Sequence, residues 1–376
     1  MKKRILVWET LGMVSGGQQM TLKVIDLLSD RYDFHCLIPT EGPLSEELKK
    51  RNIPYTLLGD QSMPTGVKAK SVSLRYLVLS FKAVAKGLSA VRREKIDIIY
   101  TPGPAALPWS AFVGAIKRKP VIWHLHHVFL DGATKRLLNF CGRWKSVRRI
   151  VAVSKCVGDQ MQNIKAREKT TVLYNPIDFE RFSSGDGQVV IEELELNLKK
   201  QLVIGHIGIL QALKKQDFVM QVGRELKNRG HDVKLLFAGC AREEDQGYVE
   251  ELHLLAEQLE MNESVLFLGQ RSDVPNLLQV MNLIMIPSSF EGFPLVGLEA
   301  AAAGVPLVAC DVAGAEEIIR ISGGGASYRE GDVMDAADKV EQIIQAPDVY
   351  IERGRSFAQL CTNERYWKKL VLCLKM

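Results

Sequence analysis

The segment 283–310 places a strand, a loop, a helix and a second strand in direct succession. Its first four residues are apolar and have the pattern of a buried strand, which Pro287 ends. The Ala-rich run 298–303 has high helix propensity, and Pro294 suits the start of that helix. Gly304 stops the helix before the next apolar run. This succession is typical of a parallel sheet covered by helices.

The same alternation of apolar runs and helical patterns recurs along the whole chain. We therefore expect an α/β fold with two domains, 1–185 and 186–354, and the polar stretch 183–200 is the best candidate for a linker. Residues 355–374 have the pattern of a last helix. The predicted strands are 4–8, 34–38, 54–58, 96–100, 120–125, 149–153 and 170–174 in the first domain, and 202–207, 233–238, 265–268, 283–286, 306–310 and 326–328 in the second.

The turn before the helix at 298–303 has the features of a phosphate site. A helix N-terminus presents unpaired N–H groups and a positive dipole end, which together favour an anion. Glu291 stands just before this helix and Glu299 lies within it. Their carboxylates are suited to accept hydrogen bonds from hydroxyl groups, such as those of ribose or a hexose. Phosphate-binding and hydroxyl-binding groups side by side indicate a nucleotide-sugar site.

The sequence PSSFEGFPLVGLEAAAAGVP at 287–306 resembles the signature of glycosyltransferase family 4, PS-x-x-E-G-F-P-L-x-x-x-E-A-x-A-x-G-x-P. The resemblance is dense from 202 to 320 and thinner before that. It implies a GT-B fold, with two Rossmann-like parallel-sheet domains facing a central cleft. The first domain would lie on the acceptor side, the second would bind the nucleotide sugar, and residues 355–376 would pack back on the first domain.

The resemblance also assigns roles to the residues of the turn. Backbone amides would hold the leaving diphosphate as negative charge develops. Glu299 would bind the ribose, and Glu291, assigned as catalytic, would bind a hydroxyl of the donor sugar. The donor-binding residues of this turn are Gly292, Phe293, Leu295 and Val296.

Two segments of the first domain resemble the family as well. Gly16 and Gly17 follow the first predicted strand and precede a helix, where the backbone can approach an anion. The resemblance places them beside the donor phosphates and the acceptor. On the strand 120–125, alternation puts His124 on the same face as His126. His126, assigned as catalytic, aligns best with a family histidine that lies over the donor sugar, and His127 is the next candidate for that alignment. We expect His124 to be a core histidine.

The second domain departs from the family at one position. An arginine and a lysine normally clamp the diphosphate after its first strand, and this chain has Lys214 but Ile209 in place of the arginine. The change removes bidentate phosphate binding. Lys215, which stands where the family has a glycine, is a candidate to replace it, as are His206 and a cation of the first domain. Arg271 lies in a segment that resembles a turn at the nucleotide base, where a solvated role and a binding role are both open.

Charge is divided unevenly along the chain. Residues 1–185 carry 30 Lys and Arg against 15 Asp and Glu, and the remainder carries 19 against 29. Basic surface suits an anionic substrate, nucleic acid or an anionic membrane, and no nucleic-acid motif accompanies it. The segment 67–95 has eight cations and one acid, so we expect an anionic membrane surface as an additional partner. Its apolar helical stripe consists of Leu77, Phe81, Val84, Leu88 and Val91.

Composition excludes several other classes. No apolar run approaches the roughly 18 residues of a membrane span, and Glu9 interrupts the first apolar run too early for a secretory signal. The seven scattered cysteines contain no CxxC pair, which argues against a disulfide framework or a zinc site. A D-x-D triplet is absent as well. We therefore expect a cytoplasmic protein, peripheral on the membrane face, that needs no metal and no cofactor.

These observations lead to one expected function and two alternatives. We expect a retaining, metal-independent glycosyltransferase of the hexosyltransferase type. It would move a sugar from a UDP- or GDP-linked donor to a glycan or lipid-linked acceptor in bacterial-type surface polysaccharide or glycolipid synthesis. Ile209 motivates the first alternative, a degenerate GT-B protein that binds a nucleotide sugar or a partner without turnover. A glycosidase that uses the two glutamates is less favoured, because the turn between them suits phosphate.

Overall fold

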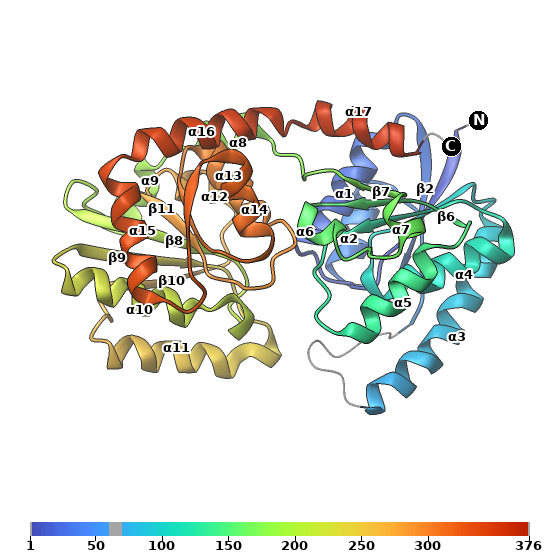
Figure 1. The fold of residues 1–376 in the computed structure, drawn as a ribbon, viewed down its shortest axis with the longest axis horizontal. Helices are drawn as coiled ribbons and strands as arrows, with labels where there is room; N and C mark the ends of the chain where they lie inside the picture. The colour runs from blue at the N-terminus through green and yellow to red at the C-terminus, as the bar shows by residue number, and fades with distance from the viewer. Residues whose placement is uncertain (1, 60–69, 375–376) are drawn as a thin grey trace. The chain divides into compact units, whose positions relative to one another are not determined.

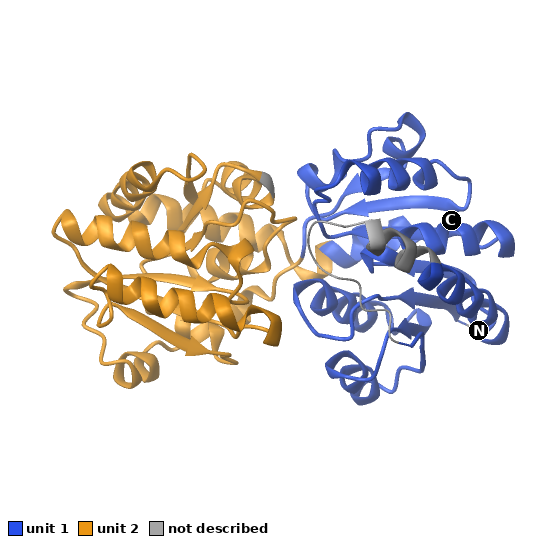
Figure 2. Cartoon of the chain, turned by 90° about the horizontal axis from the view of Figure 1, so that it is seen from below, with its two compact units in different colours: residues 1–175, 366–376 blue, residues 176–365 orange. Residues whose placement is uncertain are grey.

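The computed structural model describes residues 2–59 and 70–374 (Figure 1). The chain forms two compact units, residues 1–175 with 366–376 and residues 176–365, called unit 1 and unit 2 (Figure 2). Each unit is one parallel sheet flanked by helices. The predicted α/β class is confirmed, and all thirteen predicted strands are present.

Unit 1 is built around a seven-stranded sheet. Strands alternate with helices, as the period of the apolar residues predicts. Its elements are β1 (Lys3–Trp8), α1 (Gly16–Leu28), β2 (Tyr32–Ile38), α2 (Pro43–Lys50), β3 (Tyr55–Leu57), α3 (Lys70–Arg93), β4 (Ile98–Thr101), η1 (Pro104–Ala106), α4 (Leu107–Lys117), β5 (Val121–Leu125), α5 (Gly132–Gly142), β6 (Val147–Ala152), α6 (Lys155–Gly158), α7 (Ile164–Arg167), β7 (Thr170–Val172) and most of α17 (Asn363–Leu374).

Unit 2 repeats the plan around a six-stranded sheet. Its elements are α8 (Phe179–Ser183), α9 (Gln188–Glu193), β8 (Gln201–Ile207), η2 (Ala212–Lys214), α10 (Gln216–Asn228), β9 (Asp232–Ala238), η3 (Glu243–Asp245), α11 (Gln246–Gln258), β10 (Val265–Gly269), α12 (Val274–Leu278), β11 (Leu283–Ile286), α13 (Leu295–Ala303), β12 (Leu307–Cys310), α14 (Ala313–Ser322), β13 (Gly325–Tyr328), α15 (Val333–Gln345) and α16 (Pro347–Leu360). The short apolar strands are buried on both faces, as in other helix-covered parallel sheets.

Each sheet has one point where the strand order reverses. The orders are β3-β2-β1-β4-β5-β6-β7 and β10-β9-β8-β11-β12-β13, and neighbouring strands pair in parallel. The connections on either side of such a point leave to opposite faces, and ligands bind there at the carboxyl ends of the strands. Sites are therefore expected in the loops after β1 and β4 of unit 1 and after β8 and β11 of unit 2.

Two segments of the chain differ from expectation. The stretch 183–200, expected as a linker, lies inside unit 2. Although the stretch is rich in charged residues, Val190 on α9 and Leu196 in the turn after it are buried. The expected helix 355–374 breaks at Cys361 and Thr362, and α16 ends there before α17 begins. Residues 366–376 then belong to unit 1.

The stripe expected on the helix of 67–95 is only partly buried. Val91 is buried, but the Phe81 side chain is 79% exposed. The buried face of α3 includes Ala83 and Gly87, and a Cβ at Gly87 would lie 2.4 Å from the Trp8 ring. The face of α3 that packs on the sheet therefore includes small residues, which allow the helix to approach the sheet closely. Residues 67–69 and the Leu77 side chain lie outside the described part of the chain.

Candidate functional site

The predicted phosphate turn of unit 2 lies at the switch point of its sheet. The loop 287–294 follows β11, and Pro294 is the N-cap of α13 with extended backbone. The N–H groups of Leu295 and Val296 therefore stand at the free amino end of a helix. Gly304 ends that helix with φ +81°, a left-handed conformation that glycine adopts at little cost. The strand, turn and helix predicted at 283–303 are confirmed.

Gly314 holds the turn from the neighbouring connection. Its N–H donates to the Glu291 carbonyl at 2.8 Å. A Cβ at Gly314 would lie 2.0 Å from the Gly292 carbonyl oxygen, a distance that no real side chain tolerates. The contact explains why a glycine follows β12, and it fixes the backbone on which Glu291 and Gly292 are carried.

Lys214 and Glu291 meet at this turn. Lys214 ends η2, after β8, and its ammonium donates to the Glu291 carboxylate. Both side chains are mostly buried. The ion pair brings together a predicted phosphate-binding cation and a predicted hydroxyl acceptor from residues that are far apart in the sequence.

Lys215 contacts the same loop through Ser289. Its Nζ donates to Ser289 Oγ at 2.5 Å and to Glu330 Oε1 at 2.8 Å, and the Ser289 hydroxyl also donates to Glu330. Lys215 has φ +52° at the N-cap of α10, a left-handed conformation that costs a non-glycine residue about 1 kcal/mol or more. The glycine that the family carries here avoids this cost. Among the described residues, the buried Ser288 hydroxyl beside this network has no hydrogen-bond partner.

His206 is a neutral, buried side chain near the end of β8. Its Nδ1 donates to the Met285 carbonyl at 3.0 Å, and its Nε2 accepts from Gln216 Nε2 at 3.2 Å. Burial lowers the pKa of His206 to about 4, so it supplies no positive charge at neutral pH. Gln216 also donates to the Ile209 carbonyl at 3.0 Å. The histidine therefore positions the loop after β8 through the Gln216 amide.

The remaining predicted residues of unit 2 lie in different settings. Arg271 donates to Glu193 at 2.5 Å and to Asp273 at 2.8 Å, and these two carboxylates raise its pKa. The structure thus gives Arg271 a local ion-pair network. Glu299 lies in the second turn of α13 and is half-buried, and Phe293 is buried. The structure therefore brings Lys214 to the glutamate turn and leaves Arg271 in its own cluster.

The predicted glycines of unit 1 open α1. Gly16 and Gly17 are its first residues, and a Cβ at Gly17 would lie 3.9 Å from His127 Nε2. The histidine loop after β5 is thus next to the amino end of α1. The Ser15 hydroxyl donates to Gln18 Oε1 at 2.6 Å. Gln18 Nε2 in turn donates to the buried Glu9 carboxylate at 3.2 Å.

Two histidines stack at the end of β5, His124 on the strand, which is buried, and His126 just after it, which is half-buried. His124 and His126 have ring centroids 4.0 Å apart, and His124 Nδ1 is hydrogen-bonded to the Tyr100 hydroxyl. Burial lowers the pKa of His124 to about 3 and, with the neighbouring imidazoles, lowers the pKa of His126 well below its ordinary value. Within the described residues, His126 Nε2 is buried without a hydrogen-bond partner. A neutral imidazole with one unused nitrogen can donate to or accept from a substrate hydroxyl.

The described residues contain neither a metal-binding cluster nor a membrane-spanning helix. No group of three or more His, Cys, Asp or Glu side chains among residues 2–59 and 70–374 could hold a metal ion. No helix in the same residues is long and apolar enough to cross a membrane.

Comparison with known families covers both units. The model of glycosyltransferase family 4 matches residues 14–181, and the model of glycosyl transferases group 1 matches residues 191–357. The chain therefore consists of a glycosyltransferase family 4 domain followed by a glycosyl transferases group 1 domain. The two matches together span both sheets, and the second contains the glutamate turn.

Relatives and solved structures extend this comparison. The glycosyltransferase is 22% identical to an Escherichia coli UDP-Gal:alpha-D-GlcNAc-diphosphoundecaprenol alpha-1,3-galactosyltransferase, over 83% of this chain and 80% of that protein. It is 29% identical to a Staphylococcus aureus capsular polysaccharide glycosyltransferase, CapM, over 71% and 72%. The crystal structure of Anabaena HepE with UDP matches with a TM-score of 0.82 at 23% identity, over 100% of this chain and 99% of that chain. The predicted GT-B fold class is confirmed.

Several residues of this glycosyltransferase site were missed or left open by the sequence. Gly314 and Glu330 were not predicted as site residues, because only the folded loops bring them to the turn. Ser288 lies in the matched signature but was given no role of its own. Lys215 carried a signal, since it stands where the family has a glycine. Glu9 was also missed; a lone acid that interrupts an apolar strand pattern could have marked it as a buried carboxyl.

Proposed function

We propose that this glycosyltransferase moves a hexose from a UDP- or GDP-linked donor to a hydroxyl of a lipid-linked glycan. The anomeric configuration is retained, and no metal ion or further cofactor takes part. The observation that carries the proposal is the turn at 291–292, where a helix amino end, a lysine and a glutamate converge. Diphosphate needs the first two groups, and a sugar hydroxyl needs the third.

The chemistry assigns each group a task. The bond from the sugar C1 to the diphosphate oxygen breaks, and the amides at the start of α13 with Lys214 stabilise the charge that develops there. The acceptor oxygen bonds to C1 on the same face, and its proton leaves with the diphosphate. Glu291 accepts a hydrogen bond from a hydroxyl of the donor sugar, and Glu299 accepts from the ribose. His126 lies on the acceptor side of the donor sugar.

The names of the relatives support the choice of substrates. The Escherichia coli relative is named for a UDP-Gal donor, an acceptor on diphosphoundecaprenol and an alpha linkage. Anabaena HepE has been crystallised with UDP-glucose. The positive charge of residues 1–185 supports a cytoplasmic enzyme that works at an anionic membrane surface, where such acceptors reside.

Calorimetric titration of UDP, GDP and their sugars tests the donor assignment, with Glu299→Ala as the diagnostic variant. The substitution removes a charge-assisted hydrogen bond of about 1.5–3 kcal/mol, so affinity should fall roughly tenfold or more. Glu250→Ala, an exposed carboxylate of α11, is the matched control and should bind as the wild type does. Unchanged donor affinity in folded Glu299→Ala would remove Glu299 from the site.

Ile209 favours a second candidate, a protein that binds the donor without turnover. The family arginine contributes two parallel hydrogen bonds to phosphate, which lysine does not reproduce. Mass spectrometry of donor incubated with a lipid-linked acceptor separates the two candidates. Transfer or donor hydrolysis supports the enzyme, whereas tight donor binding with neither product supports the binding protein.

A further inference from the structure

Unit 1 contains a basic groove at the amino edge of its sheet. The groove has a volume of about 1330 Å³ and lies where α4 runs into β5, α5 runs into β6, and α7 begins. None of the described residues that line it is acidic. The candidate substrate residues of unit 1 lie at the opposite, carboxyl edge. The cations that line the groove are Arg118, Lys119, Arg143, Lys145, Arg148, Arg149 and Lys165.

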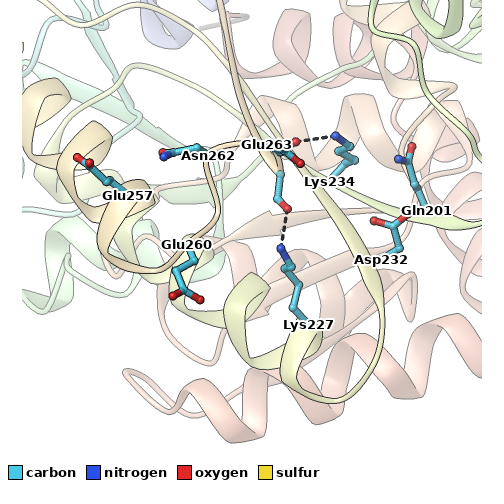
Figure 3. A pocket seen from close by; sticks show the side chains of 9 residues that line it. Gln201, Lys227, Asp232, Lys234, Glu257, Glu260, Asn262 and Glu263 are labelled. Atoms are coloured by element: carbon cyan, nitrogen blue, oxygen red, sulfur yellow. Dashed lines mark hydrogen bonds between the residues drawn. The ribbon is translucent and has the colours of Figure 1, made fainter.

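The corresponding edge of unit 2 is different. The hollow at this edge has a volume of about 570 Å³. Four carboxylates and two lysines line it (Figure 3). Lys234 Nζ donates to the Glu263 carbonyl at 2.6 Å, and Lys227 Nζ donates to Ser264 Oγ at 3.2 Å. Both lysines are thus used by the protein itself. A groove of one charge sign is therefore not a general result of this fold.

The groove's charges are mostly uncompensated within the described chain. Lys119 pairs with Asp97 at 3.9 Å, and none of the other six lining cations has a carboxylate at ion-pair distance among residues 2–59 and 70–374. Burial, followed by the charges of Arg148 and Lys165, lowers the pKa of neighbouring Lys169. Like charges held this close repel one another, so an anion in the groove would relieve that repulsion.

Helix ends account for only part of the cluster. The helix dipole favours a cation after the last turn of a helix, and Arg118 and Arg143 occupy such positions at the ends of α4 and α5. Arg148 and Arg149 lie on β6, so no helix end accounts for them, and Lys165 lies in the single turn of α7. Their positions therefore point to a ligand that lies outside the fold.

Exposed apolar side chains accompany the cations. Ile164 lines the groove and is 74% exposed, and Phe140 on α5 is 49% exposed with the Arg143 guanidinium 4.5 Å above its ring. Ile116 on α4 and Phe81 on α3 are exposed as well, and α3 packs on α4 as α4 packs on α5 (Figure 1). A soluble polyanion would use the cations alone. A lipid surface uses both kinds of side chain.

We propose that this groove docks unit 1 on an anionic lipid surface. Headgroup phosphates enter the groove, and Ile164 and Phe140 lie at the level of the acyl boundary. The inference rests on the proposed lipid-linked acceptor, because such docking keeps the enzyme at the surface that carries it. It places the contact at the amino edge of the sheet, away from the residues assigned to substrate.

Vesicle co-sedimentation of the full chain tests the proposal. The protein should pellet with phosphatidylcholine vesicles that contain phosphatidylglycerol, should stay in solution with phosphatidylcholine alone, and should be released by high salt. Arg148→Ser with Lys165→Ser should weaken binding roughly thirty-fold. The matched control is Lys199→Ser with Lys200→Ser, an equal charge change at exposed positions of unit 2, which should bind as the wild type does.

A second pair of variants tests the apolar part. Ile164→Ser should weaken vesicle binding, whereas Val189→Ser on α9, also highly exposed, should not. Equal losses in the groove pair and the control pair would overturn the proposal, because net charge alone would then explain binding. Binding of soluble polyphosphate without any vesicle binding would also overturn it.

UDP titration of the same variants keeps the two proposals separate. The groove variants should bind UDP as the wild type does, which also shows that they are folded. Vesicle binding without UDP binding would contradict the proposed function and leave the docking surface standing. UDP binding without vesicle binding would contradict the docking surface and leave the proposed function standing.

Discussion

Glu9 is a buried carboxyl group at the end of β1. Glu9 is only 2% exposed. Its carboxylate accepts hydrogen bonds from Thr21 Oγ1 at 2.5 Å, Gln18 Nε2 at 3.2 Å and the Thr10 N–H at 3.4 Å. Burial raises its pKa, and these hydrogen bonds oppose the shift only in part. No lysine or arginine in the described chain pairs with it. The protonated form is therefore favoured by folding.

The raised pKa of Glu9 predicts a pH dependence of stability. A carboxyl whose folded pKa exceeds its unfolded pKa contributes stability below the unfolded value and loses it as pH rises through the folded value. Glu9→Gln cannot ionise, so its free energy of unfolding relative to wild type should increase with pH across that window. Urea unfolding at a series of pH values measures this difference. Asp33→Asn, at an exposed position of β2, is the control and should give a smaller slope; equal slopes would contradict the assignment.

Single residues were predictable where the sequence carried the chemistry and not where packing did. Glu291 and Lys214 were assigned to one site, and the structure places their side chains in contact. The neutral state of His206 could not be predicted, because it follows from burial between Met285 and Gln216. The Arg271 pair with Glu193 was also hidden, since it joins segments that are distant in the sequence.

At the scale of elements, strands and helices followed from apolar periodicity, while the contacts between loops did not. All thirteen strands were predicted because parallel strands in a helix-covered sheet are short, continuous apolar runs. The break between α16 and α17 and the burial of Val190 were missed. Both features depend on which unit a segment packs against, and the apolar periodicity of the segment alone does not predict this packing.

The glutamate turn is an element that depends on one glycine. Gly314→Ala would place a methyl group 2.0 Å from the Gly292 carbonyl oxygen, so the turn at 291–292 must move. We expect UDP affinity to fall at least tenfold, because a displaced turn no longer aims its amides at the diphosphate. Calorimetric titration measures the loss. Gly247→Ala on α11, where a Cβ meets nothing within 4 Å, is the matched control; wild-type affinity in Gly314→Ala would show that the turn does not bind UDP.

At the scale of the whole molecule, each unit has its own sheet and its own buried core. Apart from Gly16 and Gly17 of unit 1, the predicted donor-binding residues lie in unit 2. A ligand that binds only the folded form stabilises what it binds, by about 2.7 kcal/mol at a hundred times Kd. For a unit of this size the melting temperature should rise by roughly 5–10 °C. We therefore expect scanning calorimetry to resolve two transitions, of which UDP raises only one. Gly314→Ala should retain both transitions and lose the shift. If UDP raised both transitions equally, the ligand would bind groups of both units, and the assignment of the nucleotide to unit 2 alone would be wrong.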